Sequence, residues 1–163
     1  MHALKGFNDF LVRIGSWGTI LFMALLAVVI PYEVIGRYVF QKMSTWSGEV
    51  STYSLVWASM LGGAVGLKKG YQVKMTTVVE ALPPVVAKVL MLVAYCFTLF
   101  FFGVMFYYGF YQTIYNARQL SPAIELVMSI PYAALPAGFL LMFFFTLEEF
   151  LLFLGLGAEG EGR

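Results

Sequence analysis

Four long stretches without a charged residue constrain this chain more than any other feature. They contain 19, 18, 29 and 22 residues and cover Ile14–Tyr32, Val50–Leu67, Val89–Ala117 and Leu126–Leu147. A helix rises about 1.5 Å per residue, so about 20 apolar residues cross the roughly 30 Å of hydrocarbon in a bilayer. The sequence therefore predicts an all-α integral membrane protein with four transmembrane helices.

The composition agrees with lipid as the surrounding solvent. Hydrophobic residues make up 61% of the 163 residues and charged residues only 12%, whereas soluble domains are about 25% charged. The net charge of +1 gives no basis for binding nucleic acid. We therefore expect the lipid bilayer as one partner and no nucleic acid.

The chain is predicted to form one membrane domain over residues 1–163, in which glycine and proline mark helix ends. Gly70 is placed to close the second helix, and Pro83 with Pro84 marks the start of the third. Residues 1–13 are expected to form either a short interfacial helix or a disordered start, and a short interfacial helix is expected in the link between the second and third spans. The predicted spans are about 14–36, 48–68, 87–116 and 127–154, followed by a flexible tail at 155–163.

The distribution of lysine and arginine predicts the orientation, because cytoplasmic loops carry an excess of these residues. With both termini in the cytoplasm, seven of the ten basic residues face inward: Lys5, Arg13, Lys68, Lys69, Lys74, Lys88 and Arg163. The three that face outward are Arg37, Lys42 and Arg118. The reverse orientation inverts this ratio.

Charge and aromatic groups gather between the first two spans, on the predicted outer side. Glu33 and Arg37 are four residues apart and share a helix face, which favours an ion pair. Glu49, across the loop, is an alternative partner for Arg37, and the sequence leaves the choice open. With Trp46, these residues predict either a structural corner at two helix ends or a contact with a partner protein.

The second span carries small residues at helical spacing. Ser59 and Gly63 are four apart, as are Gly62 and Gly66. This spacing lets two helix backbones approach closely, which favours packing in lipid. It predicts a packing face against a neighbour in this chain or in another one.

Chemistry within this chain is disfavoured by what the spans lack. Cys96 is the only cysteine and His2 the only histidine, and the middles of the spans contain no acid, base or histidine. Haem anchoring, a metal cluster and a nucleophile–base pair all require such residues. We expect no enzyme activity and no cofactor in this chain. A stand-alone oligomeric four-helix exporter is the alternative, but it needs an acid inside the membrane, and Glu33 lies near the outer end.

The order of several short motifs resembles a known family. "GRYVF" is followed by "WSGEVSTYSLVW", "LGGAVGLKKGYQV" and "LPP", and later by "LSPAIELVMSIPYAALPAGF". From about Val34 to Phe139, this order is similar to the small membrane subunit of tripartite ATP-independent periplasmic (TRAP) transporters, the DctQ-type family. In that family the outer-loop pattern corresponds to Arg37, Trp46 and Glu49, the small-residue stretch to Gly62, Gly63 and Gly66, and the start of the fourth span to Pro131 and Pro136.

The resemblance implies a three-part, sodium-coupled symporter in a bacterial inner membrane. A periplasmic binding protein captures an organic acid, such as a dicarboxylate or a sialic acid, and a large multi-span subunit transports it. The small subunit supports the large one and helps to dock the binding protein, with sodium coupling in the large subunit. One departure is that Gln72 and Thr76 stand where the family often has histidine and aspartate.

Overall fold

The computed structural model describes residues 2–41, 44–70 and 83–155. Within these ranges, four helices are long and apolar enough to cross a membrane, which confirms the predicted fold class. The elements are α1 (His2–Tyr38), α2 (Thr45–Lys68), α4 (Pro84–Tyr115), a 3₁₀ turn at Asn116–Arg118, α5 (Ser129–Tyr132) and α6 (Ala134–Phe153).

Glycine and proline set several of the helix boundaries. Gly70 follows α2 with φ of 70°, a left-handed conformation that glycine adopts without a Cβ penalty. Its N–H donates to the carbonyl of Leu67 at 3.2 Å and so satisfies one terminal acceptor of the helix. Pro83 caps α4 and Pro84 is its first residue, where the missing N–H of proline breaks no helical hydrogen bond.

The first helix is longer than the sequence predicts. Residues 2–38 form one continuous helix of 37 residues, about 55 Å long at 1.5 Å per residue. The separate interfacial helix expected in residues 1–13 is not formed, because no proline interrupts the helix before Pro31. The second expected interfacial helix, with Gln72 and Thr76, and the tail beyond Gly155 lie outside the described residues.

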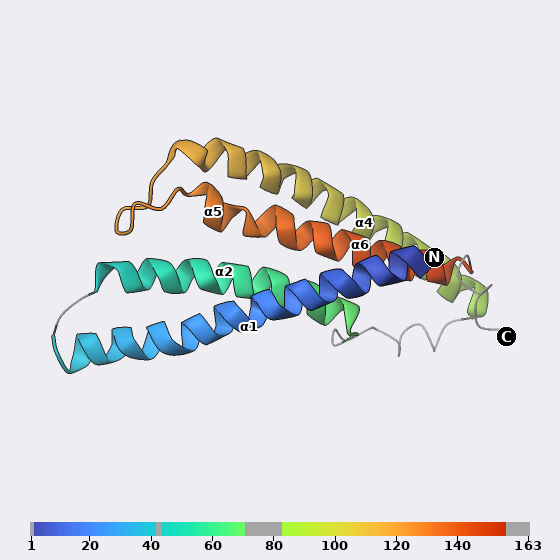
Figure 1. Ribbon diagram of the computed structural model, residues 1–163. Helices are drawn as coiled ribbons and strands as arrows, with labels where there is room; N and C mark the ends of the chain where they lie inside the picture. Colours follow the sequence, from blue (N-terminus) through green and yellow to red (C-terminus); the bar gives the residue numbers. More distant parts are fainter. Residues whose placement is uncertain (1, 42–43, 71–82, 156–163) are drawn as a thin grey trace.

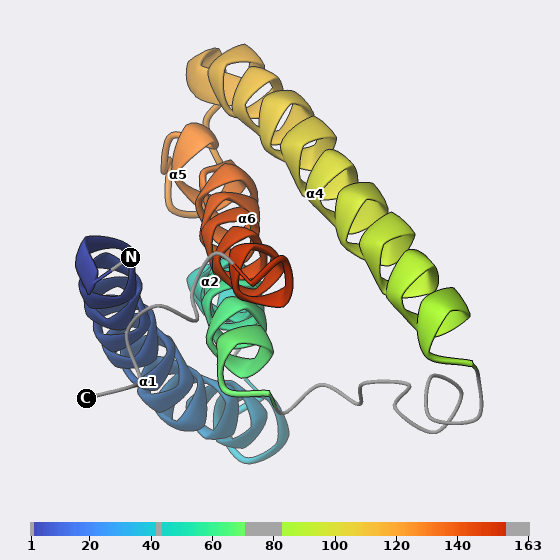
Figure 2. The same ribbon diagram turned by 90° about the vertical axis from the view of Figure 1, so that its right-hand side faces the viewer.

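The four long helices form an open row instead of a closed bundle (Figure 1). α1 packs on α2, α2 on α6, and α6 on α4. Figure 2 shows α4 on the far side of α6 from α1, set apart from α1 and α2. Buried residues make up 28% of the most apolar part of the α2 span and 33% of that of the span formed by α5 and α6. The corresponding shares are 11% for α1 and 6% for α4. The two outer helices therefore leave most of their apolar surface for lipid or a partner protein.

Candidate subunit-contact sites

The charged corner at the predicted outer end is an ion pair within α1. Nη2 of Arg37 lies 3.1 Å from Oε1 of Glu33, so Arg37 pairs with Glu33. The two side chains are 51% and 24% exposed, respectively. They border a hollow of about 240 Å³ that is also lined by Ser44, Thr45 and Gly48 at the start of α2. An exposed pair of this kind contributes about 0–1 kcal/mol to stability, so the corner is better suited to contact than to holding the fold.

Trp46 lies at the same corner and packs against Tyr32 of α1. Its ring lies 5.7 Å from that of Tyr32, between centroids, at an interplanar angle of 32°. Trp46 remains 43% exposed. Aromatic residues with one apolar and one polar edge are favoured at membrane interfaces. The pair joins the outer ends of α1 and α2 and leaves an aromatic surface open.

Glu49 lies in the first turns of α2 and holds the loop between α4 and α5. It accepts hydrogen bonds from the backbone N–H groups of Ala123, at 3.0 Å, and Ile124, at 3.3 Å. It also accepts one from the hydroxyl of Ser121. Charge-assisted bonds to a carboxylate are about twice as strong as neutral ones. Glu49 is therefore committed to this loop.

A second polar cluster, at the predicted inner end, joins three helices. Glu148 of α6 has a side chain only 5% exposed, and its Oε2 lies 2.5 Å from Nζ of Lys68 in α2. Asn8 of α1 is fully buried and donates its amide to the same carboxylate. That amide also lies 3.3 Å from the carbonyl of Phe144. A buried carboxylate requires such partners, so this inner cluster ties α1, α2 and α6 together.

The small residues of α2 divide between two neighbours within the chain. A Cβ at Gly62 would lie 3.3 Å from Thr19 of α1, and a Cβ at Gly63 would lie 3.2 Å from Met142 of α6. Ser59 is exposed, and a Cβ at Gly66 would meet nothing within 4 Å among the described residues. Among the described residues, Ser59 and Gly66 therefore contribute no close contact between helices of the row.

The tightest approach of α2 to α6 involves a glycine that the spacing argument did not include. A Cβ at Gly138 would lie 2.8 Å from the Cβ of Met60 and 3.4 Å from its Cα. Pro131 and Pro136 are both buried near the start of the fourth span. The ring of Pro136 comes 3.3 Å from the Cβ position of Gly109 in α4. Pro136 therefore lies at the close contact between α6 and α4.

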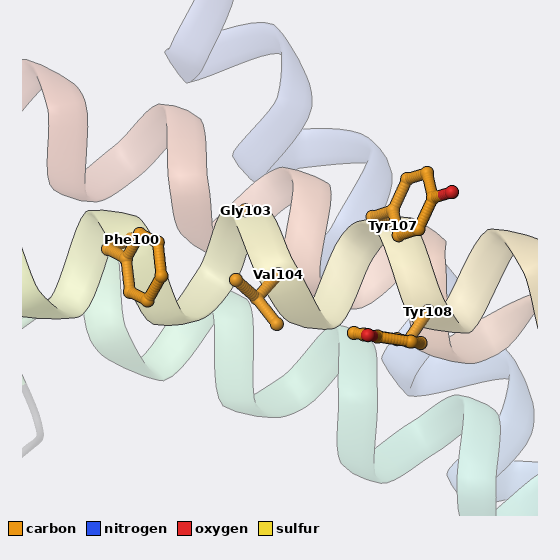
Figure 3. A pocket seen from close by; sticks show the side chains of 5 residues that line it. All are labelled: Phe100, Gly103, Val104, Tyr107 and Tyr108. Atoms are coloured by element: carbon orange, nitrogen blue, oxygen red, sulfur yellow. The ribbon is translucent and has the colours of Figure 1, made fainter.

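The outward face of α4 is rich in aromatic rings. Tyr107 is 67% exposed and Tyr108 is 63% exposed. With Phe100, Gly103 and Val104 they line a shallow hollow of about 320 Å³ (Figure 3). This arrangement is typical of an aromatic belt at the membrane interface. Among the described residues, no three His, Cys, Asp or Glu side chains are grouped closely enough to hold a metal ion.

Sequence reasoning missed the inner cluster and the partner of Glu49. One signal was available for the first: Glu148 ends the fourth charge-free window and Lys68 ends the second. The predicted topology puts both ends on the same membrane face, so an acid and a base meet there. Asn8 and Ser121 gave no comparable signal, because neither an asparagine nor a serine is unusual at these positions.

These features are those of a multi-pass helical membrane protein whose charged side chains lie toward the helix ends. Residues 26–155 match the family described as tripartite ATP-independent periplasmic transporters, DctQ component. The match covers well over half of the chain, and the chain therefore belongs to this family, the small membrane components of TRAP transporters.

One relative is the ectoine TRAP transporter small permease protein TeaB of Halomonas elongata. It is 26% identical over 119 residues, which cover 72% of this chain and 62% of the relative. The matched part of the chain thus spans less than two thirds of that protein's length.

Proposed function

We propose that this chain supports a large multi-span subunit that carries the substrate across a bacterial inner membrane. The observation that carries the proposal is the open row of helices, whose flanking helices α1 and α4 expose most of their apolar surface. A transport pathway for a charged solute usually needs acidic, basic or histidine side chains inside the membrane, and the middles of these spans have none. A supporting subunit needs surface and close helix packing, and the row supplies both.

The proposed cargo of the complex is a small organic solute taken up with sodium. Organic acids such as dicarboxylates or sialic acids fit the family, and the relative in Halomonas elongata is named for ectoine. Substrate capture is assigned to a soluble periplasmic binding protein, and sodium coupling to the large subunit. The outer corner at Arg37 and Trp46 is proposed to contact one of these two proteins.

Purification of the tagged chain tests the central assignment. A large multi-span protein encoded next to this chain should co-purify with it from membranes. Vesicles that contain this chain alone should show no solute uptake, and vesicles that contain both membrane proteins should show sodium-dependent uptake when the binding protein is added. Transport by the isolated chain would overturn the proposal.

Glu148 is a second acid that could serve as the proton site of a stand-alone exporter. Glu148 is buried, but its carboxylate is held by Lys68 and Asn8 at the inner end of the row. A proton site that turns over must exchange protons with both sides of the membrane, and an acid fixed in an ion pair at one end is poorly placed for that. The geometry therefore favours a structural role for Glu148.

Substitution of Arg37 separates contact from stability. Arg37→Ala should change the free energy of unfolding by less than about 1 kcal/mol, because the Glu33 pair is exposed. Uptake by the complete system should nevertheless fall, since the guanidinium is half exposed and open to a partner. Arg13→Ala, an exposed arginine at the opposite end of α1, is the matched control. Wild-type uptake and assembly by Arg37→Ala would remove the corner from the proposed contact surface.

A further inference from the structure

Aromatic side chains form a stripe along one side of α4 that runs to the C-terminal end of the helix. The spacing of its members along the chain places them on one helix face. All six are exposed: Phe97, Phe100, Tyr107, Tyr108, Tyr111 and Tyr115. The rings of Tyr111 and Tyr115 are stacked, with centroids 6.4 Å apart. We call these six residues the α4 stripe.

The hollow described above interrupts the α4 stripe at Gly103. Phe100 lies on one side of it along the helix, and Tyr107 and Tyr108 lie on the other (Figure 3). A Cβ at Gly103 would meet nothing within 4 Å among the described residues. The described part of the chain therefore leaves the floor of this hollow open to an occupant from outside.

The α4 stripe becomes more polar toward the end of the helix. Phenylalanines occupy its first part, tyrosines follow, and Arg118 stands in the 3₁₀ turn after α4. Arg118 is exposed, and none of the described acids forms an ion pair with it. The stripe thus pairs an apolar hollow with an uncompensated positive charge at its end.

The length of α4 places these groups at different depths in a bilayer. Its 32 residues give a helix about 48 Å long, close to the roughly 40–45 Å of a bilayer with its headgroup regions. A helix that crosses this whole thickness has Tyr115 and Arg118 among the headgroups, on the predicted outer side. Gly103 lies about 18 Å deeper along the helix axis than Tyr115, which puts the hollow in the hydrocarbon of the same leaflet.

We propose that the α4 stripe binds one anionic phospholipid, with its phosphate at Arg118 and one acyl chain in the hollow at Gly103. A guanidinium binds phosphate oxygens through two parallel N–H groups, and the hydroxyls of Tyr111 and Tyr115 can donate to the same headgroup. The hollow offers an apolar surface at a depth that an acyl chain reaches. The occupant is a lipid, so this site does not depend on which protein the chain supports.

The shape of the α4 stripe favours lipid over a second membrane helix. Helices in a bilayer associate closely where small residues let their backbones approach, as α2 and α6 do at Gly138. The α4 stripe instead presents large rings on both sides of a single glycine. These rings hold a straight helix away from the hollow, whereas a flexible acyl chain can bend into it.

Native mass spectrometry of the full chain, purified in detergent with any membrane partner it retains, measures the Kd of added dioleoylphosphatidylglycerol. Gly103→Leu fills the hollow and Arg118→Gln removes the positive charge. Each should raise Kd about tenfold, which corresponds to about 1.4 kcal/mol. Both variants should fold, because Gly103 has open space beside it and Arg118 is exposed.

Two matched changes at exposed positions nearer the start of α4 serve as controls. Ala94→Leu adds the same bulk as a leucine at Gly103 would, and Lys88→Gln removes a charge from the opposite end of the helix. Both should leave Kd unchanged. Wild-type Kd values for Gly103→Leu and Arg118→Gln would overturn the proposal. An equal loss in the controls would also overturn it, because lipid would then adsorb without a defined site.

Dihexanoylphosphatidylglycerol separates the headgroup part of the site from the acyl-chain part. Its chains are too short to reach the hollow from the level of the headgroups. Arg118→Gln should therefore weaken binding of this short lipid, and Gly103→Leu should not. A loss of short-lipid binding in Gly103→Leu would contradict the assignment of the hollow to an acyl chain.

Photo-cross-linking in native membranes identifies the occupant directly. p-Benzoylphenylalanine in place of Tyr108 keeps an aromatic ring beside the hollow, and irradiation should attach one phospholipid, detected by its mass. Adding Gly103→Leu should lower the yield, whereas an unchanged yield would indicate bulk lipid and contradict a defined site. A cross-link to a second copy of this chain or to another membrane protein would show that protein covers the α4 stripe and would overturn the proposal.

Discussion

Replacing Lys68 with methionine should lower the free energy of unfolding by about 3–5 kcal/mol, the cost of removing one partner from a buried ion pair. The substitution keeps the length of the side chain but leaves the Glu148 carboxylate, 5% exposed, without its counter-charge. Denaturant unfolding of the purified protein in detergent measures the loss. Lys69→Met removes the same charge from the exposed neighbour and should cost less than about 1 kcal/mol.

A double-mutant cycle separates the ion pair from the general effect of removing charge. Glu148→Leu should cost less than Lys68→Met, because the Lys68 ammonium, already 19% exposed, can extend toward water. The double substitution Lys68→Met with Glu148→Leu should be nearer to wild type than either single change, since replacing a buried pair with apolar residues is often neutral. Strictly additive losses would show that the two side chains do not interact.

Adding a methyl group at Gly138 should destabilise the protein by about 1–3 kcal/mol, the range for overpacking a tight contact. The new Cβ would lie 2.8 Å from the Cβ of Met60 and 3.4 Å from its backbone, so α2 and α6 would have to separate. The effect exceeds the gain of up to about 1 kcal/mol that alanine has over glycine in a helix. Thermal unfolding in detergent micelles measures the net change.

Two other glycines supply matched controls for this prediction. Gly103 in α4 and Gly66 in α2 would place a Cβ where no described atom lies within 4 Å. Gly103→Ala and Gly66→Ala should therefore stabilise the isolated chain by about 0.5–1 kcal/mol through helix propensity. If Gly138→Ala behaved like these two, the close approach of α2 and α6 would not be a determinant of stability. A loss in Gly66→Ala only when the large subunit is present would place that subunit on the outward face of α2.

The four-helix class was predictable because hydropathy is a property that adds along the chain. Each charge-free window reports the cost of transfer into lipid without reference to any other window. The end of α2 and the start of α4 were predictable for a similar reason. Gly70 and Pro83 set these boundaries through the conformations of their own backbone. The N-terminal part of α1 was not: its helical spacing fitted a separate surface helix, and the contact of Asn8 with Glu148 lies 140 residues away.

The candidate site residues show the same division. The acid-first spacing of Glu33 and Arg37 anticipated their ion pair, because both lie on one helix. The partner of Glu49 could not be predicted, because from the sequence either Glu33 or Glu49 could pair with Arg37. The loop at Ser121 that binds Glu49 lies 72 residues further along the chain, and the packing of α6 on α2 and α4 brings the two together. Likewise, the spacing of Gly62 and Gly63 indicated close packing without saying that the two glycines face different helices.

The sequence alone determined the solvent, the number of spans, the predicted orientation and the absence of acids, bases and histidine from the middles of the spans. These follow from the free energy of placing individual side chains in lipid or in water. Only the tertiary structure decided that the helices form an open row, that Glu148 joins three of them, and that Glu49 binds the loop between α4 and α5. Lipid provides no hydrophobic force that selects one helix neighbour over another. The neighbours are therefore chosen by close backbone approaches and by polar contacts between residues far apart in the chain.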